Sequence, residues 1–268
     1  MFRPIALATF LLGAAVPQLE AADPAAPITA TILPGWVQAD GTRMAALHLE
    51  LARGWKTYWR APGDAGIPPV FDWSGSRNLG SVAVMWPTPH VFDDNGMRSI
   101  GYKGSVTIPL VIAPDAQDQP VSLRLGLDLG VCSDICMPFR LDLDAAISDD
   151  RTRPDPAIAA ALAQMPYSAR EAGVRAATCA FAPSPDGLQV EAQVTMPSAG
   201  GTEVMVIEPG QGDIWVSETR TRRNGDALTG VSELVPVRGG TIALDRTDIR
   251  LTVIGQRHAV EIRGCTAG

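Results

Sequence analysis

Two stretches of alternating apolar and polar residues, joined by a short segment that holds two cysteines, constrain the fold of this chain most strongly. Every second residue is apolar from Val121 to Leu129, and the alternation returns from Phe139 to Ala145. A period of two is typical of a β-strand that buries one face. The two stretches therefore predict neighbouring strands, with the segment Gly130–Pro138 at their connection near one end of a sheet.

Short segments with the same alternation recur along the rest of the chain, separated by residues that favour turns. Many short strands at regular spacing are typical of a β-sandwich, and the sequence indicates neither a parallel sheet nor a nucleotide-binding glycine-rich loop. Hydrophobic residues make up 46% of the chain, which is enough for packed cores. Further strands are expected at residues 28–33, 44–51, 71–73, 82–86 and 106–112, and then at 174–181, 188–196, 203–208, 214–217, 227–237, 241–244, 249–253 and 260–262.

One helix is expected between the two strand-rich halves. Pro156 suits the first position of a helix, the alanine-rich run after it favours helix, and Pro166 ends the element at about Met165. This helix marks a domain boundary in an all-β chain. We predict a first β domain at residues 22–148, a linker with the short helix at 149–169, and a second, smaller β-sandwich-like domain at 170–268.

The N-terminus predicts a signal peptide. Arg3 gives a positive start, residues 4–16 form an apolar run, and Ala21 and Ala22 are small residues suited to signal peptidase. The run is too short to cross a bilayer as a helix, which needs about 20 residues. We therefore expect residues 1–21 to be cleaved and the mature protein to be exported to the periplasm.

The charge of the chain argues against a nucleic-acid partner. Its net charge is −7, whereas nucleic-acid binding needs a basic face. The densest basic cluster consists of Arg220, Arg222 and Arg223, which lie between two polar turns. We expect a solvated loop there.

The cysteine pair in the predicted turn is the main candidate for chemistry. Four cysteines in an exported protein are expected to pair, and Cys132 and Cys136 are close enough in sequence to do so. Their bridge would close only a small loop, and disulfide stabilisation grows with loop length, so a redox role is favoured over a structural one. A structural bridge stays open, as does a soft-metal site with Met137 as a third donor for Cu(I). A zinc site is not indicated, because the three histidines are scattered.

The other two cysteines predict a structural disulfide. Cys179 lies in the first strand of the second half, and Cys265 follows its last strand. A bridge between them closes a loop of about 87 residues, counted from 179 to 265 inclusive. A loop of that length gives about 4 kcal/mol or more of stabilisation in the chain-entropy model.

Five segments of the first domain carry a further pattern. They are Gly54–Trp59, Pro62–Gly66, Trp86–Pro89, Gly101-Tyr102 and Val131–Pro138. Together they resemble the N-terminal periplasmic domain of the thiol:disulfide interchange protein DsbD, most of all in its ScsB-type relatives, which are associated with copper tolerance. The resemblance covers about residues 28–147.

The resemblance implies an immunoglobulin-like β-sandwich for the first domain and puts Cys132 and Cys136 at the redox-active positions. In this family the pair takes electrons from a membrane-embedded partner domain and passes them to oxidised periplasmic thioredoxin-like proteins. The present sequence ends at Gly268 without the membrane domain and thioredoxin-like domain that follow in DsbD. A separate membrane-embedded donor of the DsbD or ScsB type is therefore expected as a partner, and no cofactor is expected.

A loop covers the cysteine pair in this family, and the segment from His90 to Met97 is its counterpart here. Phe92 is the expected covering side chain, with His90 and Tyr102 beside it. Two features differ from DsbD: the aromatic pair usual in its loop is not evident, and DsbD has a longer gap between its cysteines.

These observations favour a thiol–disulfide oxidoreductase-like protein that relays reducing equivalents by thiolate attack through a mixed disulfide. Cys136 is the favoured attacking thiol, and Cys132 would then resolve the mixed disulfide. Two alternatives stay open. One is a copper-binding protein that uses Cys132, Cys136 and Met137, and the other is a binding module whose disulfides are only structural.

Overall fold

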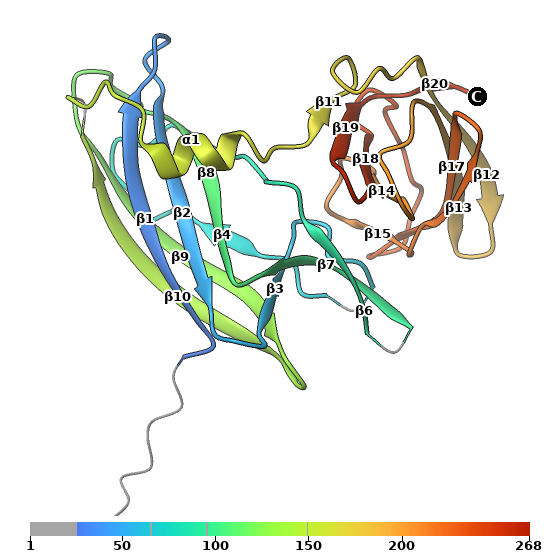
Figure 1. Ribbon diagram of the computed structural model, residues 1–268, viewed down its shortest axis with the longest axis horizontal. Coiled ribbons are helices and arrows are strands. Elements are labelled where there is room, and N and C mark those ends of the chain that lie inside the picture. Colours follow the sequence, from blue (N-terminus) through green and yellow to red (C-terminus); the bar gives the residue numbers. More distant parts are fainter. Residues whose placement is uncertain (1–25, 65, 95, 149) are drawn as a thin grey trace, which may run out of the picture.

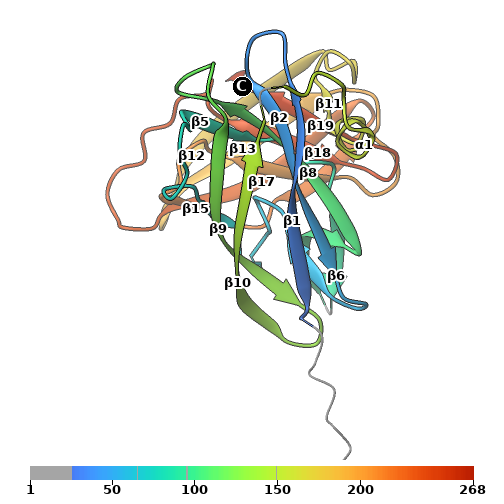
Figure 2. The same cartoon turned by 90° about the vertical axis from the view of Figure 1, so that its left-hand side faces the viewer.

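Figure 1 shows two β-sandwich domains joined by a linker that carries one short helix. The structure is a computed structural model and describes residues 26–64, 66–94, 96–148 and 150–268. The predicted signal peptide, residues 1–21, lies outside the described residues. No helix in those ranges is long and apolar enough to cross a membrane. The view in Figure 2, turned by a quarter, shows β1, β9 and β10 of the first domain in front of the second domain.

The first domain consists of two antiparallel sheets. Its strands are β1 (Ile28–Val37), β2 (Arg43–Leu51), β3 (Lys56–Tyr58), β4 (Val70–Asp72), β5 (Ser81–Val84), β6 (His90–Asp94), β7 (Met97–Lys103), β8 (Ser105–Ala113), β9 (Val121–Cys132) and β10 (Cys136–Ile147). One sheet has the order β1-β2-β8-β5, and the other has the order β10-β9-β3-β7-β6 with β4 beside β9. The predicted immunoglobulin-like sandwich is consistent with this arrangement.

The alternation in β9 is confirmed by the burial of its side chains. Val121, Leu123, Leu125 and Leu127 are buried in the core, whereas Arg124 on the other face is exposed. β10 pairs with β9 along its whole length without a shift in register. The hairpin that they form is the long element whose tip carries the first cysteine pair.

The linker helix α1 (Pro156–Leu162) is shorter than predicted, because it ends before Met165. Its first turn is capped by the carboxylate of Asp155, which accepts hydrogen bonds from the amides of Ala157 and Ile158. The side chain of Ile158 is fully buried against β2. Pro166 disfavours the helical conformation at the residue before it, which explains why the last turn unwinds early.

The second domain repeats the two-sheet architecture. Its strands are β11 (Tyr167–Ser168), β12 (Ala176–Ser184), β13 (Gly187–Thr195), β14 (Val204–Glu208), β15 (Ile214–Val216), β16 (Arg220–Asn224), β17 (Ala227–Pro236), β18 (Arg250–Ile254), β19 (Ala259–Arg263) and β20 (Thr266–Ala267). One sheet has the order β11-β19-β18-β14, and the other has the order β15-β17-β13-β12-β20 with β16 also on β17. Cys179 in β12 is joined to Cys265, just before β20, with Cα atoms 5.7 Å apart.

Three local predictions were wrong. Residues 241–244 form no strand, although Ile242 and Leu244 do pack on the core, because alternation reports burial and not the presence of a ladder partner. The segment 90–97 is a β-hairpin (β6 and β7) and not an irregular loop. The arginine cluster lies in β16, where Arg223 forms an ion pair with the buried Glu203.

Candidate functional site

The tip of the β9–β10 hairpin holds Cys132 and Cys136 directly opposite one another. Cys132 is the last residue of β9, Cys136 is the first of β10, and the two are partners in the ladder. Their Cα atoms lie 4.0 Å apart, and the sulfur atoms are joined in a disulfide. The uninterrupted register of the hairpin therefore delivers both cysteines to the same end and the same face of the sheet.

The two cysteines differ in exposure. Side chains alternate between the faces of a strand, so Cys132 continues the outer face on which Arg124 and Asp128 are exposed. Only 5% of Cys132 is nevertheless exposed, whereas Cys136 is exposed. Ile135 in the turn is 73% exposed. Cys136 can thus be reached by another protein, and Cys132 must be covered by residues that lie outside the sandwich core.

Strand β3 contributes some of the residues that surround the two cysteines. Lys56 is the ladder partner of Cys132, and Tyr58 follows two residues later on the same face. The hydroxyl of Tyr58 donates a hydrogen bond to Sγ of Cys136 over 3.4 Å. Between them Thr57 points the other way, and its hydroxyl donates to the carbonyl of Gly130. The Gly54–Trp59 motif therefore forms the strand that lies beside the disulfide.

Two glycines make room for the Tyr58 ring. A Cβ atom on Gly130 would lie 2.8 Å from the ring, and one on Gly66 would lie 2.9 Å from it. Contacts this short do not occur for real Cβ atoms, so a side chain at either position would displace the ring or the strand. Because Gly130 has no side chain, Tyr58 can lie across β9 and reach Cys136 on β10.

The β6–β7 hairpin lies beyond β3, on the same side of Cys132. Phe92, Lys56 and Cys132 line one hollow of about 610 Å³. Nζ of Lys56 lies 5.1 Å from the centroid of the Phe92 ring and donates a hydrogen bond to Oγ of Ser99 on β7. Lys56 therefore links the hairpin to the strand beside the disulfide, and Phe92 contributes to the wall next to Cys132.

The other two residues expected in the cover occupy different places. The His90 ring lies 6.3 Å from the Phe92 ring between centroids, and His90 is exposed. Tyr102 faces the core, where its hydroxyl donates to the carbonyl of Pro87 over 2.8 Å. Burial raises the pKa of Tyr102 above its usual range. Tyr102 thus supports the strand under the site, while a covering role for His90 and Phe92 stays a prediction.

Sequence reasoning missed Lys56 and Tyr58 as site residues. The segment around the cysteines contains neither lysine nor histidine, and the pairing of β3 with β9 joins residues far apart in sequence. The only signal was the spacing of two between Lys56 and Tyr58, which puts them on one face of a strand. Among the described residues, no group of three or more His, Cys, Asp or Glu side chains is arranged to hold a metal ion.

Comparisons with known proteins find a matching family model and a similar solved structure. Residues 22–146 match the family model described as the thiol:disulfide interchange protein DsbD, N-terminal. The crystal structure of the N-terminal periplasmic domain of ScsB from Proteus mirabilis is similar to this chain, with a TM-score of 0.64 and 22% identity, over 90% of this chain and 92% of that one. No curated protein matches the sequence. The resemblance drawn from the motifs is confirmed, and the likeness to ScsB extends to the fold of both domains.

Proposed function

We propose that this chain, whose first domain matches the DsbD N-terminal family, is a thiol–disulfide exchange protein that acts through Cys132 and Cys136. One observation carries the proposal: the ladder holds the two cysteines together, with Cys136 exposed and Cys132 buried, and a tyrosine hydroxyl contacts Sγ of Cys136. An attacking thiol must be accessible, and a resolving thiol needs only to reach its neighbour. This division supports Cys136 as the attacking residue and Cys132 as the resolving one.

The exchange runs in two balanced steps from the reduced chain. The Cys136 thiolate attacks one sulfur of a partner's disulfide, which forms a mixed disulfide and releases the partner's other sulfur as a thiolate that takes up a proton. The Cys132 thiolate then attacks Sγ of Cys136. The Cys132–Cys136 disulfide forms, and the partner leaves with both of its thiols reduced. Two electrons and two protons pass from this chain to the partner.

Tyr58 and Lys56 would favour this reaction by stabilising thiolates. A hydrogen bond to the charged form of a group lowers its pKa, as does a nearby cation. In the reduced chain, the Tyr58 hydroxyl can donate to the Cys136 thiolate from its present position. Lys56, the ladder partner of Cys132, lies on the same face of the sheet, and its ammonium group donates to Ser99 on β7.

The surface around Cys136 supports a protein as the exchange partner. Ile135 in the turn beside the cysteine is exposed, and Ile67 and Val70 are exposed on the segment beside β9. Exposed apolar side chains that gather in one place are typical of protein contact sites. We assign oxidised thioredoxin-like proteins as electron acceptors and a membrane-embedded protein of the DsbD or ScsB type as the donor. The predicted signal peptide and the family match support a periplasmic location.

Copper binding through Cys132, Cys136 and Met137 is supported less well. Successive side chains of a strand point to opposite faces, and Cys136 and Met137 are consecutive in β10. The three donors therefore do not converge on one point while the strand is intact.

The test is trapping of the mixed disulfide with the mature protein. Reduced Cys132→Ser, mixed with an oxidised thioredoxin-fold protein, should accumulate a covalent complex through Cys136. Reduced Cys136→Ser should form much less. A redox titration of the wild type should show that the Cys132–Cys136 bridge exchanges with the same partner while the Cys179–Cys265 bridge stays intact. If neither variant forms a complex and the first bridge does not exchange, the proposal fails.

A further inference from the structure

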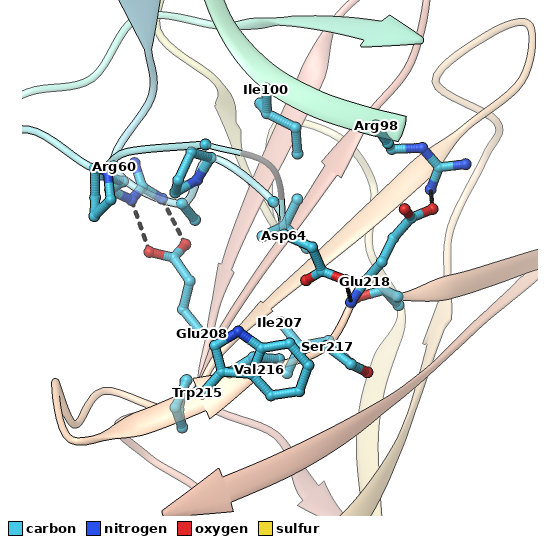
Figure 3. Close-up of a pocket in the computed structure, with 18 of the residues that line it drawn as sticks. Arg60, Asp64, Arg98, Ile100, Ile207, Glu208, Trp215, Val216, Ser217 and Glu218 are labelled. Carbon is cyan, nitrogen blue, oxygen red and sulfur yellow. Dashed lines mark hydrogen bonds and ion pairs between the residues drawn. The ribbon is translucent and has the colours of Figure 1, made fainter. Parts of the chain in front are cut away.

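A cleft of about 480 Å³ lies between the two domains (Figure 3). The wall from the first domain is the loop from Arg60 to Pro68 with Arg98 of β7. The wall from the second domain consists of β14, β15 and the residues just after β15. The volume is within the range of sites that bind small ligands or short peptide segments.

Both arginines of the cleft are paired with carboxylates, and the carboxylate of Asp64 accepts a hydrogen bond from the amide of Glu218. Arg60 donates hydrogen bonds to both carboxylate oxygens of Glu208 over 2.9 and 3.0 Å and to Glu261 over 3.0 Å. Arg98 forms an ion pair with Glu218 over 2.8 Å. Figure 3 shows the Arg60–Glu208 and Arg98–Glu218 pairs bridging the two walls. A charged ligand would have to compete with existing pairs, so the cleft favours a neutral occupant.

The remaining surface is apolar and includes strand edges. Ile100, Ile207 and Trp215 line the cleft, and Trp215 is 47% exposed. β14 and β15 are terminal strands of their sheets. A terminal strand presents backbone donors and acceptors to which an extended peptide can pair. An extended polypeptide segment with apolar side chains therefore fits both the lining and the edges.

The cleft shares a wall with the redox site. Gly66 lines the cleft and also lies against the ring of Tyr58, whose hydroxyl reaches Cys136. The next residue, Ile67, is 37% exposed and lies against Gly130. The Tyr58 ring and the loop residue Gly66 thus connect the exposed cysteine to the wall of the cleft.

We propose that the cleft binds an extended apolar segment of the polypeptide that exchanges disulfides with Cys136, with Trp215 as the anchor. The inference rests on the proposed exchange function and gives the second domain a role in it. The first domain supplies the chemistry, and the second domain supplies a wall of the recognition site.

The test compares Trp215→Ala with Tyr167→Ala, which removes another exposed aromatic of the second domain. The substrates are two peptides that carry one cysteine as a mixed disulfide with glutathione. One has a long Ile/Val stretch next to the cysteine, and the other has Ser in its place. The reduced wild type should react faster with the apolar peptide by about tenfold, which corresponds to about 1.4 kcal/mol of contact free energy. Trp215→Ala should lose this preference, and Tyr167→Ala should keep it.

Two further measurements distinguish a failure of peptide binding in the cleft from a failure of disulfide exchange. The rate with oxidised glutathione should be the same in all three proteins. If the wild type reacts with both peptides at equal rates, the proposed peptide binding in the cleft is wrong, and the proposed exchange function still stands. If the wild type reacts with no disulfide, the exchange function fails. Peptide binding in the cleft is then tested by fluorescence, with a cysteine-free Ile/Val peptide added to the protein. The signal of Trp215 is obtained as the difference between the wild type and Trp215→Phe. An unchanged signal overturns the proposed peptide binding.

Discussion

Removing the hydroxyl of Tyr58 is the most direct perturbation of the proposed exchange. The hydroxyl donates to Sγ of Cys136, and the ring is held between Gly66 and Gly130. Phenylalanine keeps the ring in that slot, so Tyr58→Phe removes the hydroxyl that donates to Cys136 and keeps the packing of the ring. In the reduced protein we expect the pKa of the Cys136 thiol to rise, because its thiolate loses a donor.

The size of the effect follows from two opposing terms. A hydrogen bond to a charged group contributes about 1.5–3 kcal/mol, and one pKa unit corresponds to about 1.36 kcal/mol, so the pKa should rise by roughly one to two units. Well below the pKa, the thiolate fraction then falls by about 10- to 100-fold. The more basic thiolate is more nucleophilic, with a Brønsted coefficient of about 0.4–0.5, which recovers roughly 3- to 10-fold. The net rate should fall by roughly 3- to 15-fold.

The assay is the rate of alkylation of Cys136 against pH in a Cys132→Ser background, with the modified peptide followed by mass spectrometry. Tyr102→Phe is the matched control, because it removes the same atom from a tyrosine that bonds to the carbonyl of Pro87. The control should lose about 1 kcal/mol of unfolding free energy and keep the pH profile.

The dependence of the alkylation rate on pH shows whether the Tyr58 hydroxyl affects the ionisation of Cys136. Tyr58→Phe should be slower at neutral pH and faster above both pKa values, so the two curves should cross. A profile that superposes on that of the parent would show that the hydroxyl does not stabilise the thiolate. A drop by one constant factor at every pH would show that Tyr58 controls access to the sulfur and not its ionisation.

Three further perturbations test other parts of the structure. Phe92→Ala removes a cation–π contact of about 0.5–1 kcal/mol, so reduction of the Cys132–Cys136 bridge by dithiothreitol should speed up by roughly two- to fivefold; an unchanged rate would argue against a cover. Replacing Cys179 and Cys265 by serine should cost about 4 kcal/mol in denaturant unfolding, more than opening the short bridge costs. Burial opposes ionisation of Glu203, but bonds from Arg223 and an amide hold its pKa below the usual value. Its stabilisation is therefore present above about pH 4.3 and lost as the pH falls through the lowered pKa. Glu203→Gln should flatten the acid limb of stability against pH, and a limb as steep as that of the wild type would assign it to other groups.

The parts of the fold that the sequence predicted are those that depend on near neighbours in the chain. The β9–β10 hairpin follows from alternation, and its turn follows from the break in that pattern. The pairing of Lys56 in β3 with Cys132 in β9 could not be predicted in this way, because no local pattern sets the register between strands far apart in sequence. Residues 241–244 illustrate the converse, since they alternate in burial and have no ladder partner.

The face of its strand to which each cysteine points carries more information about function than the number of residues between the two cysteines. Cys132 shares the outer face of β9 with Arg124 and Asp128, so alternation alone predicts an exposed sulfur. It is 5% exposed, while Cys136 opposite it on the same face is open. A buried residue at an outward position requires a cover from another element; β3 lies beside Cys132, and a cover by the β6–β7 hairpin stays a prediction. The Cys179–Cys265 bridge also joins a buried cysteine to a half-buried one, but Cys179 is buried at an inward position in the core. What distinguishes Cys132 is burial at an outward position, and a thiol that waits to resolve a mixed disulfide benefits from being shielded beside an accessible partner.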